Sequence, residues 1–335
     1  MLTLPNVLAG IILVALTAYV LFAGADFGGG VWDLLASGPR KSAQRELVAH
    51  AIGPVWEANH VWLILAIVLL FTCFPTAFAR IAITLHIPLT LMLIGIVLRG
   101  SAFVFQSYGG GGGRVFATAS LVTPVLLGIS VGSVAAGGVR EVGSGTRDGY
   151  YASYVAPWLT PFGIAVGLFA LACFAFLAAV YLTVEARETD LQEDFRRRAL
   201  ASGAAVGLMA ALGLALFRTV LPVHVGVVVV VAMSLLGAVA ALARRYYAGA
   251  RLAAALAVTL IVWGWGFAQY PYLLPPDLTI AAAAAPPVTL RLALIAVLVG
   301  AVLLFPSLYY LLRVFKVSRR MPFAAPPTTR PAPPR

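Results

Sequence analysis

The sequence predicts an all-α membrane protein that crosses the bilayer about nine times. Three observations lead to this prediction. Of the 335 residues, 61% are hydrophobic and only 10% are charged, and the mean hydropathy is +0.97. That composition supplies too little polar surface to coat a soluble globule. The apolar residues also form long runs, and most of the charged residues lie in short segments between them.

A spanning helix needs about 20 mostly apolar residues. Windows of that kind lie near residues 5–35, 52–74, 79–105, 116–137, 160–184, 199–221, 223–243, 252–270 and 290–313. Tyrosine and tryptophan residues gather at several window ends, where interfacial anchors are expected.

The basic residues are distributed unequally between the two sides that these windows define. One side carries Arg40, Lys41, Arg45, Arg114, Arg187, Arg196, Arg197, Arg198, Arg244, Arg245, Arg251 and the basic residues from Arg313 onward. The other carries Arg80, Arg140, Arg147 and Arg218, with Arg291 at a helix start. By the positive-inside rule, the amino terminus is outside and the carboxyl terminus is cytoplasmic. A count of eight helices would spoil this asymmetry, so we expect nine.

The net charge of +11 does not indicate nucleic-acid binding. The basic residues sit in short loops, where they orient helices in the membrane. Both cysteines, Cys73 and Cys173, fall inside apolar segments, so the sequence offers neither a disulfide framework nor a CxxC metal site. We therefore expect no metal ligands in this chain.

The two halves of the chain resemble each other in their connectors. The first predicted helix ends in Asp33 and a basic connector to Glu46, and the fifth ends in Glu185 and a charged connector to Arg198. Such a parallel is typical of internal repeats in membrane proteins. We predict a four-helix unit with a polar cluster over 1–138, a second four-helix unit over 139–271, a peripheral ninth helix over 272–320 and a disordered cytoplasmic tail over 321–335.

Three charged residues in the first half lie inside apolar windows: Asp26, Glu57 and Arg99. With a rise of about 1.5 Å per residue, each lies about 10 Å inside the predicted cytoplasmic boundary. Charged groups at such depth are costly unless they are paired or used. They are therefore a candidate buried cluster, which could conduct protons or could only fix the helix register.

The second window opens with the most unusual stretch, Gly53-Pro54-Val55-Trp56-Glu57-Ala58-Asn59-His60-Val61-Trp62-Leu63. Trp56 and Glu57 lie four and three residues before His60, so all three share one helix face. Glu57 is thus a candidate proton acceptor with a titratable neighbour, and Asn59 adds a polar amide.

Imidazole is a common axial haem ligand, and His60 and His86 lie on adjacent predicted helices. However, His86 is near the outer end of its helix and His60 is near mid-membrane. One haem plane does not easily suit both residues, so haem ligation is expected elsewhere.

Three motifs carry a family resemblance. They are Gly24-Ala25-Asp26-Phe27-Gly28-Gly29-Gly30, the stretch from Gly53 to Leu63, and Arg99-Gly100-Ser101-Ala102-Phe103. In order and spacing they resemble subunit II of cytochrome bd quinol oxidase, over residues 1 to about 320.

The resemblance implies a complex in a prokaryotic cytoplasmic membrane that oxidises quinol and reduces dioxygen to water. It implies that haem b and haem d are bound by a homologous subunit I, with Glu57 as proton conductor, Asp26 as its polar neighbour and Arg99 as an electrostatic partner. A structural quinone or lipid and small single-helix accessory subunits are further partners found in that setting. The chain departs from the family pattern at Val104-Phe105-Gln106, where further charges are common.

Two other readings of the same residues stay open. A proton-coupled transporter could use Asp26 and Glu57, and it would function without a redox partner. Alternatively, a purely structural assembly subunit would tolerate Glu57→Gln without loss of oxidase activity.

Overall fold

The computed structural model describes residues 3–107, 113–141, 149–217, 220 and 225–318. Within helices, the side chains at 52–58, 103–104, 106–107, 114, 116, 308 and 311–318 also lie outside the described part. The predicted tail over 321–335 falls outside it as well. The chain divides into a first compact unit up to Ala293 and a second unit from Leu294 onward.

The first half of the chain is helical, and prolines set several of the helix boundaries. Pro5 lies in the first turn of the first helix, and Pro75 begins a new helix directly after Phe74 ends the previous one. Proline suits a first helical turn because its missing N–H is not needed there. The helices are α1 (Leu4–Leu34), α2 (Lys41–Cys73), α3 (Pro75–Thr84), α4 (His86–Ser107) and α5 (Gly113–Ala135).

The second half repeats long apolar helices and adds a small hairpin. The Thr160 hydroxyl accepts a hydrogen bond from the Gly163 N–H and caps the start of one of these helices. The elements are α6 (Tyr150–Tyr154), α7 (Pro161–Glu185), α8 (Thr189–Leu216), α9 (Val225–Ala243), α10 (Tyr247–Gln269), β1 (Tyr272–Leu274), β2 (Leu278–Thr279), α11 (Ile280–Ala283) and α12 (Pro287–Ser318). The strands β1 and β2 are antiparallel, with Tyr272 opposite Thr279.

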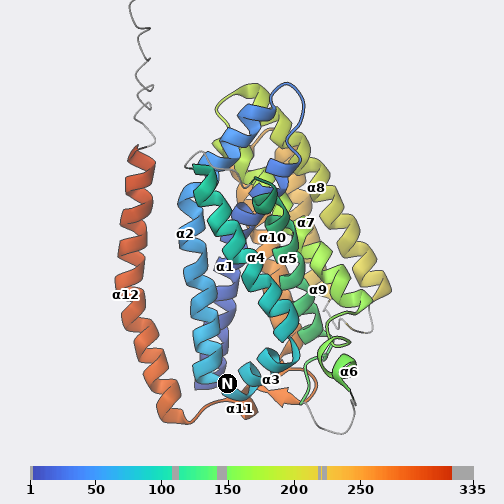
Figure 1. Ribbon diagram of the computed structural model, residues 1–335, viewed down its shortest axis with the longest axis vertical. Coiled ribbons are helices and arrows are strands. Elements are labelled where there is room, and N and C mark those ends of the chain that lie inside the picture. The colour runs from blue at the N-terminus through green and yellow to red at the C-terminus, as the bar shows by residue number, and fades with distance from the viewer. Residues whose placement is uncertain (1–2, 108–112, 142–148, 218–219, 221–224, 319–335) are drawn as a thin grey trace, which may run out of the picture. The chain divides into compact units, whose positions relative to one another are not determined.

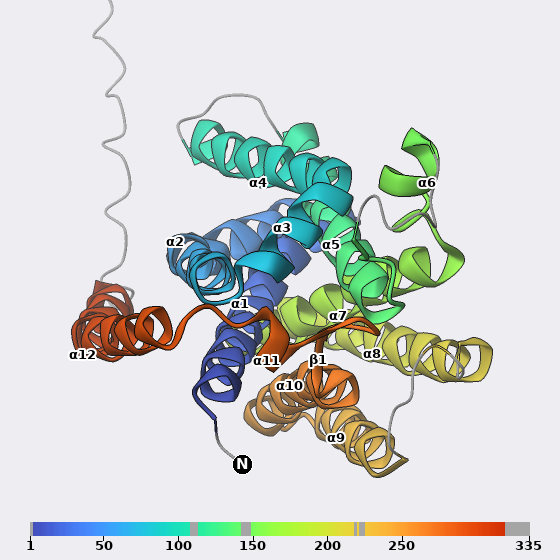
Figure 2. The same ribbon diagram turned by 90° about the horizontal axis from the view of Figure 1, so that it is seen from below.

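Helices α1 and α7 lie side by side at the centre of the first unit (Figure 2). Helices α2 and α5 pack on α1, and α4 packs on α5. In the second half, α8 and α10 pack on α7, and α9 packs on α10. Figure 1 shows the long helices of this unit with their axes roughly aligned with one another.

The expectation of an all-α polytopic membrane protein is confirmed. Among the described residues, seven helices are long and apolar enough to cross a membrane, and an eighth span is possible if Asn59–Cys73 and α3 count as one. That pair is bent by 116°, and His86–Ala102 is a shorter apolar helix. The window 79–105 is thus not one straight helix, because the chain breaks at Leu85 between α3 and α4.

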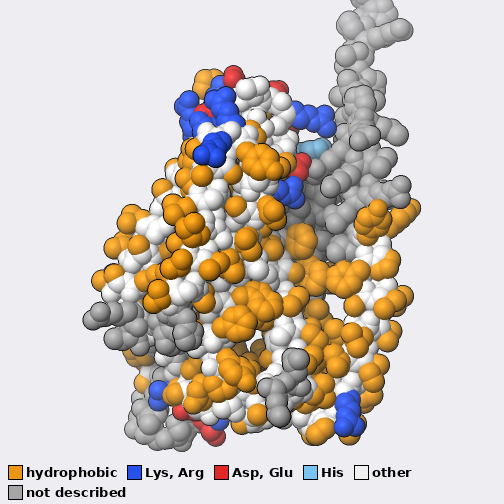
Figure 3. Space-filling view, turned by 180° about the vertical axis from the view of Figure 1, so that it is seen from behind, with side chains coloured by type: hydrophobic (Ala, Val, Ile, Leu, Met, Phe, Trp, Pro, Cys, Tyr) orange, Lys and Arg blue, Asp and Glu red, His pale blue; other side chains and the backbone are white. Residues whose placement is uncertain are grey.

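Charges gather at the end where α1 meets α2, which is the upper end of the first unit in Figure 1. The face in Figure 3 shows Lys and Arg side chains concentrated there and apolar side chains over the middle. This is the distribution expected of a helix bundle in a bilayer.

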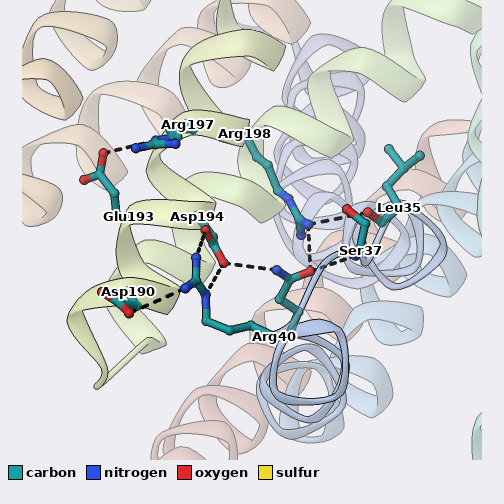
Figure 4. Close-up of polar contacts among 9 residues, drawn as sticks. Leu35, Ser37, Arg40, Asp190, Glu193, Asp194, Arg197 and Arg198 are labelled. Atoms are coloured by element: carbon teal, nitrogen blue, oxygen red, sulfur yellow. Dashed lines mark hydrogen bonds and ion pairs between the residues drawn. The ribbon is translucent and has the colours of Figure 1, made fainter.

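A polar cluster at that end joins the α1–α2 connector to the first turns of α8 (Figure 4). Arg40 binds the carboxylate of Asp194 through Nε at 2.8 Å and Nη2 at 2.7 Å, in a bidentate pair. Gln44 donates to Asp194 at 3.1 Å and accepts from Arg198 Nη2 at 2.7 Å. The hydrogen bond to Asp194 raises the pKa of Arg40 above its usual value, so Arg40 remains charged.

Candidate functional site

Asp26 lies in α1 beside a close helix–helix contact. A Cβ atom added to Gly28 would lie 2.0 Å from the Phe174 carbonyl oxygen, and one added to Gly24 would lie 2.5 Å from Leu177 Cδ1. The two glycines therefore allow α7 to approach α1 closely, as expected for small residues between membrane helices. Asp26 is fully buried and contacts residues of α2 and α4.

Arg99 of α4 is the ionic partner of Asp26. Its Nη2 donates to the Asp26 backbone carbonyl at 2.7 Å and to Oδ1 of the same residue. Its Nε donates to Ser120 Oγ of α5 at 3.1 Å. The guanidinium carbon also lies 4.6 Å from the centre of the Phe27 ring, in a cation–π arrangement.

Asn59 of α2 completes the cluster. Its Nδ2 donates to Asp26 Oδ2 at 3.5 Å, a long hydrogen bond, and its side chain is fully buried. Both carboxylate oxygens of Asp26 are thus engaged by side chains of other helices. We call Asp26, Arg99, Asn59 and Ser120 the acid–arginine cluster.

The burial of the cluster decides its energetics. Asp26 is 0% exposed and Arg99 is 1% exposed. Removing two charges from water costs several kcal/mol per ion, and removing only one partner of such a pair typically costs about 3–5 kcal/mol. The pair therefore fixes the position of α1 relative to α4, because either charge would be costly to leave buried without its partner. The hydrogen bond from Arg99 to Ser120 joins α5 to the same site.

The structure brings some of the predicted site residues together. Asp26, Arg99 and Asn59 lie in one cluster, whereas the side chains of Trp56 and Glu57 lie outside the described part of α2. His60 follows Asn59 directly, and its side chain is half-buried and engaged in an interaction.

Two residues that contact Arg99 could not be recognised from the sequence. Ser120 and Phe27 are residue types common in membrane helices, and neither carries a charge that marks it. Phe27 had one weak signal, since it follows Asp26 directly inside the glycine-rich stretch.

One of the two histidines considered for haem ligation, His86, contacts other protein groups through both ring nitrogens. His86 is the first residue of α4, where its Nδ1 lies 2.9 Å from the Ile83 carbonyl oxygen and its Nε2 lies 3.4 Å from the Tyr150 hydroxyl. Among the residues that the structure describes, no three side chains of His, Cys, Asp or Glu gather as a metal centre would require.

Fold and site together define a multi-pass, all-α membrane protein with a buried acid–arginine cluster in its first half. A family model for cytochrome bd terminal oxidase subunit II matches residues 4–315. The chain belongs to that family.

The relatives agree with this assignment. A putative cytochrome bd menaquinol oxidase subunit II of Bacillus subtilis is 22% identical over 325 residues, covering 90% of this chain and 92% of the relative. The cytochrome bd-I ubiquinol oxidase subunit 2 of Escherichia coli is 25% identical over 214 residues, covering 60% of this chain and 53% of the relative.

A solved structure of the bd oxidase from Geobacillus thermodenitrificans has a similar chain. The TM-score is 0.79 at 25% sequence identity, and the match covers 94% of this chain and 99% of that chain. The relatives are subunits of cytochrome bd quinol oxidases, which are oxidoreductase complexes, and this chain is a subunit of that enzyme class.

Proposed function

We propose that this chain is subunit II of a bd-type terminal oxidase that oxidises quinol and reduces dioxygen to water. In this proposal it contributes proton entry from the cytoplasm and an interface to the haem-bearing subunit I. The observation that carries it is the fully buried Asp26–Arg99 pair, which lies in a chain matched by the family along nearly its whole length.

Glu57 is the proposed proton carrier. It lies two residues before Asn59, which binds the carboxylate of Asp26. Residues two apart on a helix do not share a face, so Glu57 belongs to the neighbouring face, with His60 three residues later. The acid–arginine cluster would then be a fixed polar wall beside the route, while Glu57 takes up and releases protons.

The same helix face supports an interface with subunit I. Val61, Ile64 and Val68 lie four, seven and eleven residues after Glu57, and they are 42%, 59% and 51% exposed. This spacing keeps one helix face. A titratable residue facing hydrocarbon is costly. We therefore propose that subunit I, rather than lipid, covers this helix face.

Haem b and haem d would be held by subunit I, where they supply electron transfer and dioxygen reduction. In this chain, the described residues near the cluster bind and orient one another and would supply polar groups along a proton route. Quinol is the proposed substrate of the complex. Membrane lipids, a structural quinone and small single-helix subunits are further proposed partners.

We also propose the organisation into two related four-helix units, 1–138 and 139–271, followed by a ninth helix over 272–320. The packing supports it, because α1 with α2 and α5 has a counterpart in α7 with α8 and α10. The concentration of basic side chains at one end supports an outside amino terminus and a cytoplasmic carboxyl terminus in a prokaryotic membrane.

The test uses the purified complex. We expect haem bands in the reduced-minus-oxidised spectrum, a large co-purifying partner and quinol-driven oxygen consumption. Glu57→Gln is expected to lower turnover by about tenfold or more, as loss of a proton-transfer group does, while the haem spectrum persists. The control is Glu141→Gln, since Glu141 is 69% exposed and pairs only with Arg80 among the described residues.

Other outcomes would favour the alternatives. Full turnover in Glu57→Gln, combined with failed assembly when the chain is absent, would indicate a purely structural subunit. A colourless preparation without a partner would overturn the oxidase proposal and favour a proton-coupled transporter. Membership of the oxidase family currently weighs against that transporter.

A further inference from the structure

Three buried polar atoms near the acid–arginine cluster have no hydrogen-bond partner among the described residues. They are Tyr19 Oη, Thr123 Oγ1 and Asn59 Oδ1. A buried polar group without a partner is costly, so native proteins rarely leave one unsatisfied. Three of them around one charged pair require an explanation.

Tyr19 belongs to the same face of α1 as Asp26. It lies seven residues earlier, two helical turns or about 10 Å along the axis. Tyr19 is 1% exposed, and its hydroxyl is close enough to Asp26 and Arg99 to interact electrostatically with both. The hydroxyl therefore lies beyond the cluster, toward the amino-terminal end of α1.

Thr123 lies on that same side of the cluster. It is one turn after Ser120 on α5, and a Cβ atom added to Gly95 of α4 would lie 2.2 Å from its Oγ1. Gly95 in turn is one turn before Arg99. Helices α1 and α4 both begin at the lower end of the first unit in Figure 1, so Tyr19, Gly95 and Thr123 are all displaced from the cluster in one direction.

Ser130, in the same helix as Thr123, has a hydroxyl group with a hydrogen-bond partner. Its Oγ donates to the Leu126 carbonyl at 2.8 Å, the usual bond of serine and threonine within a helix. Thr123, although 1% exposed, does not make such a bond among the described residues. Its hydroxyl is therefore available to a partner outside its own helix.

We propose that ordered water molecules bridge Tyr19, Thr123 and Asn59 and extend the acid–arginine cluster toward the amino-terminal end of α1. Buried waters typically make about three hydrogen bonds to groups that would otherwise be unsatisfied. The Tyr19 hydroxyl passes its proton to one water as it accepts a proton from another, so its own charge is unchanged after each transfer. Tyr19 is thus a positioning and relay residue that continues the proton route inward. This inference rests on the proposed function of proton delivery.

The test replaces single hydroxyl groups in the intact complex. Tyr19→Phe and Thr123→Val each remove one hydroxyl and keep the shape of the side chain. We expect proton uptake during turnover, followed with a pH-sensitive dye, to slow by about tenfold or more in Tyr19→Phe. The haem spectrum and the KM for quinol should not change. The matched control is Ser130→Ala, which removes a hydroxyl satisfied by its own helix and should leave proton uptake at the wild-type rate.

A different result is expected if no water binds the Tyr19 hydroxyl. Tyr19→Phe then removes an unsatisfied polar group, so the midpoint of thermal unfolding rises and proton uptake stays at the wild-type rate. That result would overturn the inference. If Glu57→Gln slows turnover while Tyr19→Phe does not, this inference fails alone. If Glu57→Gln has no effect, the proposed proton entry fails instead.

A second measurement needs no variant and covers the case in which the substitutions prevent assembly. Radiolytic hydroxyl-radical labelling of the wild-type complex modifies buried side chains that contact bound water. We expect Tyr19 to be modified although it is 1% exposed, while Phe174, which is 2% exposed and lies at the α1–α7 contact, is not. Absence of label on Tyr19 would contradict the bound water.

Discussion

The Arg99 guanidinium makes hydrogen bonds, an ion pair and a ring contact at one buried site. It binds the carboxylate and carbonyl of Asp26, donates to Ser120 and stacks on Phe27. Such a site selects arginine over lysine, because the planar guanidinium donates in several fixed directions and stacks on aromatic rings. The cluster is therefore an electrically compensated unit, and its two charges depend on each other.

This dependence gives a stability prediction. Arg99→Met leaves the Asp26 carboxylate buried without its cation, and we expect a loss of about 3–5 kcal/mol in the free energy of unfolding. Asp26→Leu combined with Arg99→Met removes both charges and should recover most of that loss. Chemical denaturation of the purified complex, followed by the haem spectrum, measures both effects. A single variant as stable as the wild type would mean that the carboxylate is compensated by another group.

The sequence could indicate some site residues but not others. Asp26 and Arg99 were recognisable because charges inside apolar windows are costly. Tyr19 and Thr123 carried no such signal, since most hydroxyl groups in membrane helices bond to their own backbone, as Ser130 does. Only the three-dimensional contacts distinguish a satisfied hydroxyl from an unsatisfied one.

At the scale of elements, the contact between α1 and α7 holds the centre of the first unit. The Trp32 indole N–H donates to the Ala175 carbonyl at 2.8 Å, and Gly28 lets the α7 backbone come close. Any shift of α1 would move Asp26 relative to Arg99 and Asn59. The geometry of the site therefore depends on this helix pair.

Gly28→Ala tests that contact. The new methyl group would lie 2.0 Å from the Phe174 carbonyl oxygen, which is backbone and cannot rotate away. We expect a loss of about 1–3 kcal/mol, as for overpacked cores, and reduced assembly of the complex. Gly10→Ala in the same helix is the matched control, because a Cβ atom there meets no atom within 4 Å. Equal thermal midpoints for the two variants would contradict the close packing.

The helices were predictable from long apolar runs, and their breaks were less so. Each predicted window contains a helix, but α2 begins at Lys41, well before the apolar window at 52. The polar residues 41–51 continue the helix into the connector, where hydropathy gives no signal. The 116° bend before α3 follows from Pro75, whereas the break at Leu85 has no such marker in the sequence.

At the scale of the whole molecule, the two charged connectors that suggested a repeat also meet in the structure. Gln44 follows α1, whereas Asp194 and Arg198 belong to α8, and the three side chains share hydrogen bonds (Figure 4). The connector of the first half is thus tied to the start of a helix in the second half. The sequence indicated the charges of both connectors but not that they would face each other, because their partners are about 150 residues apart.

Gln44 makes three of the hydrogen bonds in this cluster, so its substitution tests the contact between the two halves. It is 3% exposed, donates to Asp194 and accepts from both Arg198 and the Ser37 N–H. Gln44→Leu removes all three bonds and leaves the half-buried Asp194 and Arg198 without this partner, so we expect a loss of about 1–3 kcal/mol in the free energy of unfolding.

The control for this prediction is Arg197→Gln. The Arg197 side chain is 77% exposed and lies 3.5 Å from Glu193, a surface ion pair that contributes about 0–1 kcal/mol. Thermal unfolding of the complex, with limited proteolysis of the α1–α2 connector as a second readout, compares the two variants. If Gln44→Leu unfolds and is cleaved like Arg197→Gln, the packing of α7 on α1 and α5 holds the halves together without the Gln44 hydrogen bonds, and the connector cluster serves only to fix the charges at that end.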